Sequence, residues 1–257
     1  MSLADAQDAD RPRAVLLWVH FDGTDFRGFQ RQQDGIRTVA GVLEEVWQAW
    51  LGEAIVARTS SRTDAGVHAR RMPVLVRTGT RVPPRGLMLG LAERLPEDVV
   101  VLEALDMPLD FDERQDAVAK RYVYRLTVGP VRRPLWRRQA WHVKGPLDPA
   151  AMQAAAGLLV GVHDFSAFRS VNCQAATTVR ELFSVEIAPG EPWTLTLYGN
   201  AFLHHMARIV AGTLVDIGRG RRTLAQLERA LILGDRTAAG QTAPADRKST
   251  RLNSSHT

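Results

Sequence analysis

Along the first half of the chain, segments of alternating hydrophobic and polar residues are separated by segments whose apolar residues recur at every third or fourth position. Alternation is typical of half-buried strands, and the longer spacing is typical of amphipathic helices. The pattern predicts strands over 14–21, 54–59, 71–77 and 99–105, and helices over 38–51 and 84–94. Strand, helix, strand, strand, helix, strand is the order of a ferredoxin-like unit.

The second half approximates the same order. Its pattern predicts strands over 122–128, 178–187 and 193–198, and helices over 149–160, 202–217 and 224–233. The expected fold class is therefore α+β, with two tandem ferredoxin-like (βαββαβ-type) halves, mixed or antiparallel sheets and a central active-site cleft. A turn at residues 107–110 places the boundary, so the expected domains are 1–108 and 109–246.

The end of the chain does not supply the closing strand that the repeat requires. Residues 247–257 contain one large apolar residue, Leu252, and show no alternation. Such a segment is not expected to fill a buried strand position. We expect 247–257 to be a non-native or disordered tail.

The composition is that of an ordinary soluble globular protein, with 45% hydrophobic and 24% charged residues. No apolar run approaches the roughly 18 residues that a membrane-spanning helix needs, and the acidic N-terminus lacks the pattern of a secretory signal. The single cysteine, Cys173, excludes an internal disulfide. These features predict a cytoplasmic protein that does not associate with membranes.

Basic residues are concentrated in one stretch, although the net charge is only +5. Nine lysines and arginines lie between Arg114 and Lys144, against one acidic residue, Asp116. Two tyrosines and two tryptophans are interleaved with them: Tyr122, Tyr124, Trp136 and Trp141. Cations for phosphates and rings for bases are what an RNA-binding surface needs. A solvated basic face in an arginine-rich chain would show the same composition, so both interpretations stay open.

A ten-residue segment, 60–69, gathers a cation, a carboxylate, a glycine and an imidazole. Asp64 lies close to Arg62, and a guanidinium beside a carboxylate lowers its pKa and keeps it ionised even when partly buried. Asp64 is therefore a candidate nucleophile or general base. The alternative is a turn in which Thr63 or Asp64 caps the next segment.

The segment 62–68, Arg-Thr-Asp-Ala-Gly-Val-His, resembles the active-site motif of the tRNA pseudouridine synthase A family. Further motifs of that family occur in the same order: 21–24 with 26 and 28–32, 120–125, 163–165 with 168–169, and 200–208. The resemblance extends from about residue 15 to 245. Several ordered motifs are far more specific than one.

The resemblance implies a tRNA pseudouridine synthase that isomerises uridine in the anticodon stem-loop without a cofactor. Asp64 matches the catalytic aspartate of the family, and it could attack C6 of the base, attack C1′ of the sugar or remove a 2′ proton. Arg208 would pair with Asp64 and keep it ionised. Tyr122 would stack on the uracil and assist proton transfer.

The resemblance also implies residues that contact the substrate. Arg62 would enter the space left by the everted nucleotide, and His68 would support the turn and line the site. Arg121, Phe202 and His205 complete the expected substrate-binding set. The expected partners are tRNA and a second copy of the chain, in a homodimer.

Two other functions are compatible with parts of the sequence. His204 and His205 suggest a metal-dependent hydrolase, but adjacent histidines on a helix point about 100° apart, so no metal is expected. The second is a non-catalytic RNA-binding or chaperone module, because the segment 111–117 is acidic where the family is basic, which weakens phosphate attraction.

Overall fold

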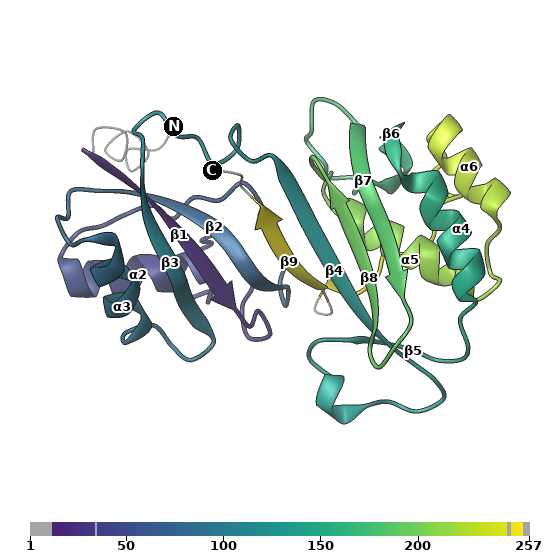
Figure 1. Ribbon diagram of the computed structural model, residues 1–257, viewed down its shortest axis with the longest axis horizontal. Helices are drawn as coiled ribbons and strands as arrows, with labels where there is room; N and C mark the ends of the chain where they lie inside the picture. Colours follow the sequence, from purple (N-terminus) through teal and green to yellow (C-terminus); the bar gives the residue numbers. More distant parts are fainter. Residues whose placement is uncertain (1–11, 34, 246–247, 254–257) are drawn as a thin grey trace. The chain divides into compact units, whose positions relative to one another are not determined.

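The computed structural model describes residues 12–33, 35–245 and 248–253, with side chains described up to residue 245. The fold is mixed α+β (Figure 1). The described residues form two compact units that divide between Val118 and Ala119, with residues 250–253 assigned to the first. The expected boundary at residue 108 therefore lies inside unit 1. Among the helices described, none is both long and apolar enough to cross a bilayer.

Unit 1 contains an antiparallel sheet with strand order β3-β1-β2. Its elements are β1 (Arg13–Phe21), α2 (Val39–Leu51), β2 (His68–Thr78), α3 (Pro84–Ala92) and β3 (Val99–Met107). Both helices cover one face of this sheet (Figure 1), where Leu17, Trp47 and Leu87 are buried in one cluster. On the opposite face, Trp18 packs in a smaller cluster with Phe111.

The strand expected over 54–59 is reduced to an isolated bridge between Arg58 and Leu75, so that prediction was wrong. The backbone hydrogen bonds of the bridge measure 2.9 and 2.8 Å. The amide of Ala57 instead donates to the Glu44 carboxylate on α2, at 3.0 Å. Because Arg58 and Leu75 exchange both bonds, the neighbouring amide of Ala57 faces away from β2, on the side where the Glu44 carboxylate accepts it.

Unit 2 contains a sheet with strand order β4-β8-β7-β6, and β5 pairs in parallel with β4. Its strands are β4 (Ala119–Val128), β5 (Trp141–Val143), β6 (Gly161–Asp164), β7 (Val179–Ala188) and β8 (Trp193–Gly199). Its α-helices are α4 (Pro149–Leu159), α5 (Met206–Gly218) and α6 (Leu224–Leu233), with two 3₁₀ turns, η1 (Pro134–Trp136) and η2 (Ser166–Phe168). The α-helices cover one face of the sheet (Figure 1), and Leu197 and Leu214 lie in the core between them.

The predicted hairpin is confirmed, because β7 pairs antiparallel with β8 and Ile187 lies opposite Leu195. Strand β6, which pairs with β7, was not expected. The helix expected from residue 202 begins only at Met206. His205, which precedes it, has φ 64°, a left-handed conformation that a helix cannot continue through.

The expectation that the C-terminal segment forms no strand was wrong for its central part, since Lys248–Asn253 is strand β9. Every residue other than proline carries a backbone donor and acceptor, so a segment with few apolar residues can still join a ladder. Residues 246–247 and 254–257 lie outside the described residues, and the non-native origin of the tail stays a prediction.

Candidate active site

In unit 1, Asp64 sits in a tight turn that precedes β2. The amide of Val67 donates to the carbonyl of Asp64 at 3.2 Å, and the amide of Gly66 donates to the carbonyl of Phe26 at 3.1 Å. The amide of Phe29 donates to the carbonyl of Thr63 at 3.2 Å. Asp64 is half-buried between buried Thr63 and an exposed alanine. The turn is therefore held against the 23–29 loop, which carries the first motif of the resemblance.

Two glycines allow this close approach. A Cβ on Gly23 would lie 2.0 Å from the carbonyl oxygen of Val67, a distance at which the backbone would have to move. Gly28 has φ +100°, and a Cβ there would lie 2.6 Å from the carbonyl oxygen of Thr63. Only glycine fits both positions without strain. The backbone of the 23–29 loop can therefore pack directly against the backbone of the Asp64 turn.

His68 is buried at the start of β2. Its Nδ1 lies 2.9 Å from Oδ1 of Asp22 and 3.2 Å from the amide nitrogen of Gly23. Asp22 Oδ1 also accepts from the amide of Thr24 at 3.0 Å and from its hydroxyl at 2.5 Å. His68 therefore braces the turn, and its contact with substrate stays a prediction. Sequence reasoning assigned no role to Asp22, although it lies within a motif of the resemblance.

In unit 2, Tyr122 lies on β4 with its side chain buried. Its ring meets the ring of Phe202 edge to face, with centroids 4.6 Å apart and an interplanar angle of 79°. Edge-to-face packing is a favoured aromatic geometry. The two residues expected to contact the base, distant in sequence, are therefore neighbours in space.

Arg208 lies in the first turn of α5. Its Nε donates to the carbonyl of Ala243 at 2.9 Å, and its Nη1 lies 3.1 Å from Nε2 of His205. The guanidinium is thereby held by two segments of unit 2. Asp64 belongs to unit 1, and its pairing with Arg208 stays a prediction.

The two adjacent histidines do not diverge as expected. His204 and His205 precede α5 rather than lying on it, and their ring centroids are 4.0 Å apart with planes tilted by 38°. The left-handed backbone at His205 turns its ring toward that of His204. The helical argument for diverging rings was therefore wrong, because neither residue is helical.

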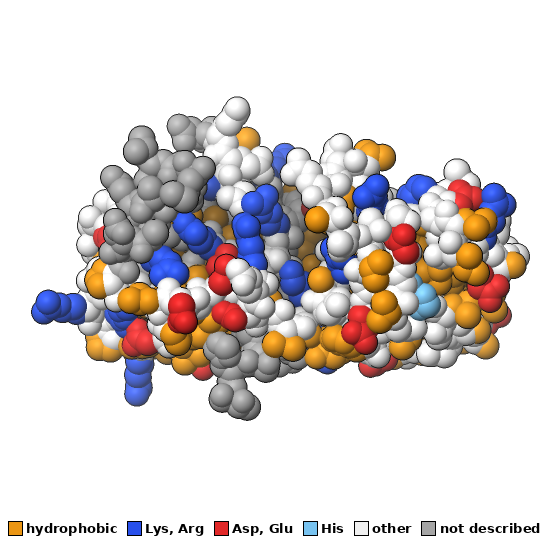
Figure 2. Space-filling model, turned by 90° about the horizontal axis from the view of Figure 1, so that it is seen from above, with side chains coloured by type: hydrophobic (Ala, Val, Ile, Leu, Met, Phe, Trp, Pro, Cys, Tyr) orange, Lys and Arg blue, Asp and Glu red, His pale blue; other side chains and the backbone are white. Residues whose placement is uncertain are grey.

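Strand β4 carries three half-buried cations of the basic stretch, Lys120, Arg121 and Arg125. The guanidinium of Arg121 lies over the ring of Tyr198, 5.0 Å from its centroid, in a cation–π contact. Burial, with a smaller contribution from Arg180, lowers the pKa of Lys120 to about 8. Farther along, the arginines of the 129–140 loop are exposed, and Arg133 pairs with Glu191. Figure 2 shows lysine and arginine side chains on one face of the molecule, with acidic side chains among them.

The acidic 111–117 segment folds on itself. Asp112 Oδ1 accepts from the amides of Arg114 at 2.7 Å and Gln115 at 3.2 Å, and Asp116 Oδ2 accepts from the amide of Asp112 at 2.9 Å. The bond from Arg114 is the main reason that the pKa of Asp112 is lowered. These carboxylates therefore close a local turn, a use that the sequence did not suggest.

Comparison with known proteins gives a consistent result. A family model described as tRNA pseudouridine synthase matches residues 155–250. A tRNA pseudouridine synthase A from Geotalea uraniireducens is 43% identical over 233 residues, which is 90% of this chain and 95% of the relative. Those from Pelobacter propionicus and Myxococcus xanthus are 44% and 40% identical, covering 91% and 90% of this chain and 96% and 87% of the relatives. The chain belongs to the tRNA pseudouridine synthase A family.

Proposed function

We propose that this chain isomerises uridine to pseudouridine in the anticodon stem-loop of tRNA, with Asp64 as the reacting carboxylate. The observation that carries the proposal is family membership along nine-tenths of the chain. The Asp64 turn supports it, since a cap alone would not need two glycines packed against the carbonyls of Thr63 and Val67.

The reaction breaks the bond between N1 of uracil and C1′ of ribose, forms a bond between C5 and C1′, and moves the C5 proton to N1. Nothing is oxidised and no group is lost, so the protein must supply a carboxylate, a proton acceptor and a place for the detached base. Attack of Asp64 on C6 or on C1′, or removal of a 2′ proton by it, each requires the ionised form. Arg208 is the proposed cation that maintains it.

The remaining proposed residues hold the nucleotide. Tyr122 and Phe202 present adjoining rings, and a base is commonly held by stacking on aromatic side chains. The side chain of Arg62 is exposed beside the turn, as insertion into the RNA stack requires. Arg121 and His205 are proposed to face the same substrate.

Family membership also supports a proposal about the fold of the two units, the oligomeric state and the location of the protein. We infer that each unit is a ferredoxin-like half, with the bridge at Arg58 standing for a shortened second strand of unit 1. A central active-site cleft, a homodimer and a cytoplasmic location belong to this proposal, the last because a single cysteine, Cys173, suits a reducing compartment.

Tritium release from tRNA carrying 5-tritiated uridine tests the proposal. Wild-type protein should release tritium over many turnovers, and Asp64→Asn should bind tRNA and release none. Asp110→Asn is the matched control, because Asp110 is an exposed carboxylate of the same unit. If wild-type protein binds tRNA without releasing tritium, it is an RNA-binding module rather than an isomerase.

A further inference from the structure

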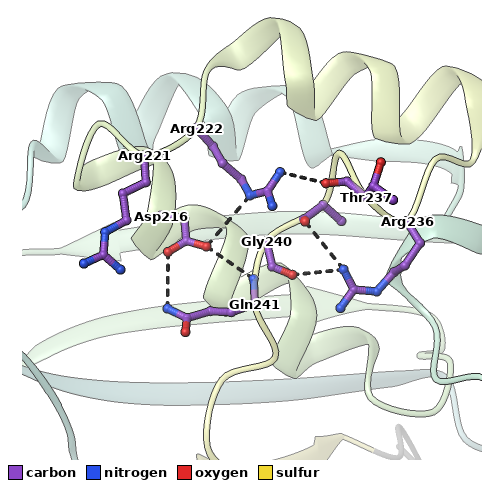
Figure 3. A pocket seen from close by; sticks show the side chains of 8 residues that line it. Asp216, Arg221, Arg222, Arg236, Thr237, Gly240 and Gln241 are labelled. Atoms are coloured by element: carbon purple, nitrogen blue, oxygen red, sulfur yellow. Dashed lines mark hydrogen bonds and ion pairs between the residues drawn. The ribbon is translucent and has the colours of Figure 1, made fainter.

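Unit 2 contains a pocket of about 480 Å³ that shares no residue with the proposed active site (Figure 3). It lies where the end of α5, the turn that follows it and the segment after α6 come together. Its lining residues are Asp216, Arg221, Arg222, Arg236, Thr237, Ala239, Gly240 and Gln241. Three arginines against one carboxylate give the lining a net charge of 3 − 1 = +2.

The one carboxylate is already engaged. Asp216 is buried, its Oδ1 accepts from Nε2 of Gln241 at 3.2 Å and its Oδ2 from the amide of Gln241 at 3.2 Å. Nε of Arg222 lies 3.9 Å from the same Oδ2. Asp216 therefore offsets part of the positive charge of Arg222. The other two arginines, Arg221 and Arg236, have no acidic partner in the pocket.

Some N–H groups of these arginines are not used in hydrogen bonds within residues 12–245. Arg222 uses Nη1 for the carbonyls of Thr237 and Ala238, at 3.0 and 2.9 Å, and Arg236 uses Nη1 for the carbonyl of Gly240 at 3.0 Å (Figure 3). Within residues 12–245, neither Nη2 has a hydrogen-bond partner, and the side chain of Arg221 has none at all. Burial, followed by repulsion from Arg222, lowers the pKa of Arg236 below the ordinary arginine value. An anion would relieve that repulsion.

The lining also indicates what kind of anion fits. It contains no aromatic ring and only one apolar side chain, that of Ala239, so it offers no surface on which a base or sugar could stack. Guanidinium groups match the oxygens of a phosphate. The pocket therefore suits a phosphate whose attached groups remain outside, as in a nucleic-acid backbone.

We propose that this pocket binds a backbone phosphate of the tRNA substrate, at a second point outside the active site. The inference rests on the proposed function. Asp216 and Arg208 lie eight residues apart on α5, which corresponds to about 12 Å along the helix axis. One RNA chain can therefore reach both places.

Salt-dependent tRNA binding by Arg221→Gln tests the pocket, because Arg221 makes no side-chain bond that folding within unit 2 would lose. A phosphate contact predicts roughly threefold weaker binding near physiological salt, and a slope of log Kd against log salt reduced by roughly 0.7 to 0.9. Arg85→Gln, an exposed arginine on α3, is the matched control.

Two outcomes separate this inference from the proposed function. If Arg221→Gln binds tRNA with the affinity and salt slope of Arg85→Gln, the inference is overturned. The pocket residues then serve only to hold the 235–241 segment in place. If wild-type protein releases no tritium but Arg221→Gln still weakens tRNA binding and its slope, the proposed function fails and the pocket stands.

Discussion

Nδ1 of His68 lies 2.9 Å from Oδ1 of Asp22, and this contact joins the first residue of β2 to the loop that follows β1. The same oxygen takes two further hydrogen bonds from Thr24. Asp64 lies four residues before His68, in the turn that this contact supports. Asp22 is therefore a positioning residue for the proposed catalytic turn, acting through His68.

Asp22→Ala should lower kcat for tritium release about tenfold and leave the affinity for tRNA nearly unchanged. The substitution removes the acceptor for the amide and the hydroxyl of Thr24 as well as the contact with His68, so a loss of about 1–3 kcal/mol of unfolding free energy is also expected. Asp22→Asn, which keeps an acceptor oxygen, should recover part of the lost kcat and part of the lost unfolding free energy. A variant that melts earlier but turns over at the wild-type rate would restrict Asp22 to a stabilising role.

Tyr122→Phe separates the ring from the hydroxyl. The ring contact with Phe202 survives, so the unfolding free energy should fall by no more than about 0.5–1.5 kcal/mol, the net contribution of one hydrogen bond. If the hydroxyl assists proton transfer, kcat should fall by about a hundredfold. Tyr122→Leu should additionally lose about 0.5–1.5 kcal/mol of aromatic contact. Tyr198→Phe, at a half-buried tyrosine on β8, serves as control, and an equal rate for both phenylalanine variants would remove the proton-transfer role.

Arg208→Lys tests whether the guanidinium must be held in place. A lysine keeps the positive charge but loses the two-sided attachment to Ala243 and His205. We expect a large loss of rate, about a hundredfold or more, with near-normal retention of tRNA on filters, and a further loss for Arg208→Ala. Unchanged turnover in Arg208→Ala would exclude Arg208 from the mechanism.

Gly212→Ala should destabilise unit 2 strongly. A Cβ at Gly212 would lie 1.8 Å from the carbonyl oxygen of Gln241, so helix α5 and the 240–243 segment would have to separate. The expected cost is about 3 kcal/mol or more, the upper end for overpacking, measured by urea denaturation. Gly157→Ala on α4 is the control, because nothing lies within 4 Å of its Cβ and it should gain about 0.5–1 kcal/mol. Similar stability for the two variants would contradict the close approach.

The lowered pKa of Lys120 predicts a pH dependence of stability. Its pKa is about 8 in the folded protein against an ordinary value of 10.5, so between these limits the unfolded chain binds more protons. Unfolding free energy should therefore rise with pH from about 8 to 10.5, as the buried cation is lost. Lys120→Met should remove this rise and be more stable than wild type at pH 7. Lys144→Met, at an exposed lysine, should keep the rise in unfolding free energy. If wild-type protein shows no such rise between pH 8 and 10.5, the lowered pKa of Lys120 is refuted.

The local elements were largely predictable, because their signals are local. The apolar run in 14–21 and the two segments on either side of Pro189 and Gly190 predict strands, and all appear as antiparallel strands. Helix α2 begins after Thr38, whose hydroxyl caps it, and ends at Gly52 with φ 67°. Each of these features depends on residues within a few positions of one another.

Features that depend on distant partners were missed. Residues 54–59 are rich in strand-forming residues, but their pairing with β2 is reduced to the bridge at Arg58, and the amide of Ala57 donates to a carboxylate on α2. The apolar pattern before Met206 continues the helix, but the left-handed backbone at His205 ends it. Strand β9 forms from a segment whose composition argues against it. In each case a tertiary hydrogen bond or backbone conformation overrode a local preference.

The amino-acid sequence by itself determined the family and the candidate residues of the active site, because each motif, such as that from Arg62 to His68, keeps its residues within a few consecutive positions. Only the tertiary structure decided that Asp22 braces that turn and that arginines from 221 to 236 line one pocket with Asp216. These groups are separated along the chain and carry no periodic signal. Their proximity follows from close packing, in which glycines let backbone segments meet where no side chain fits.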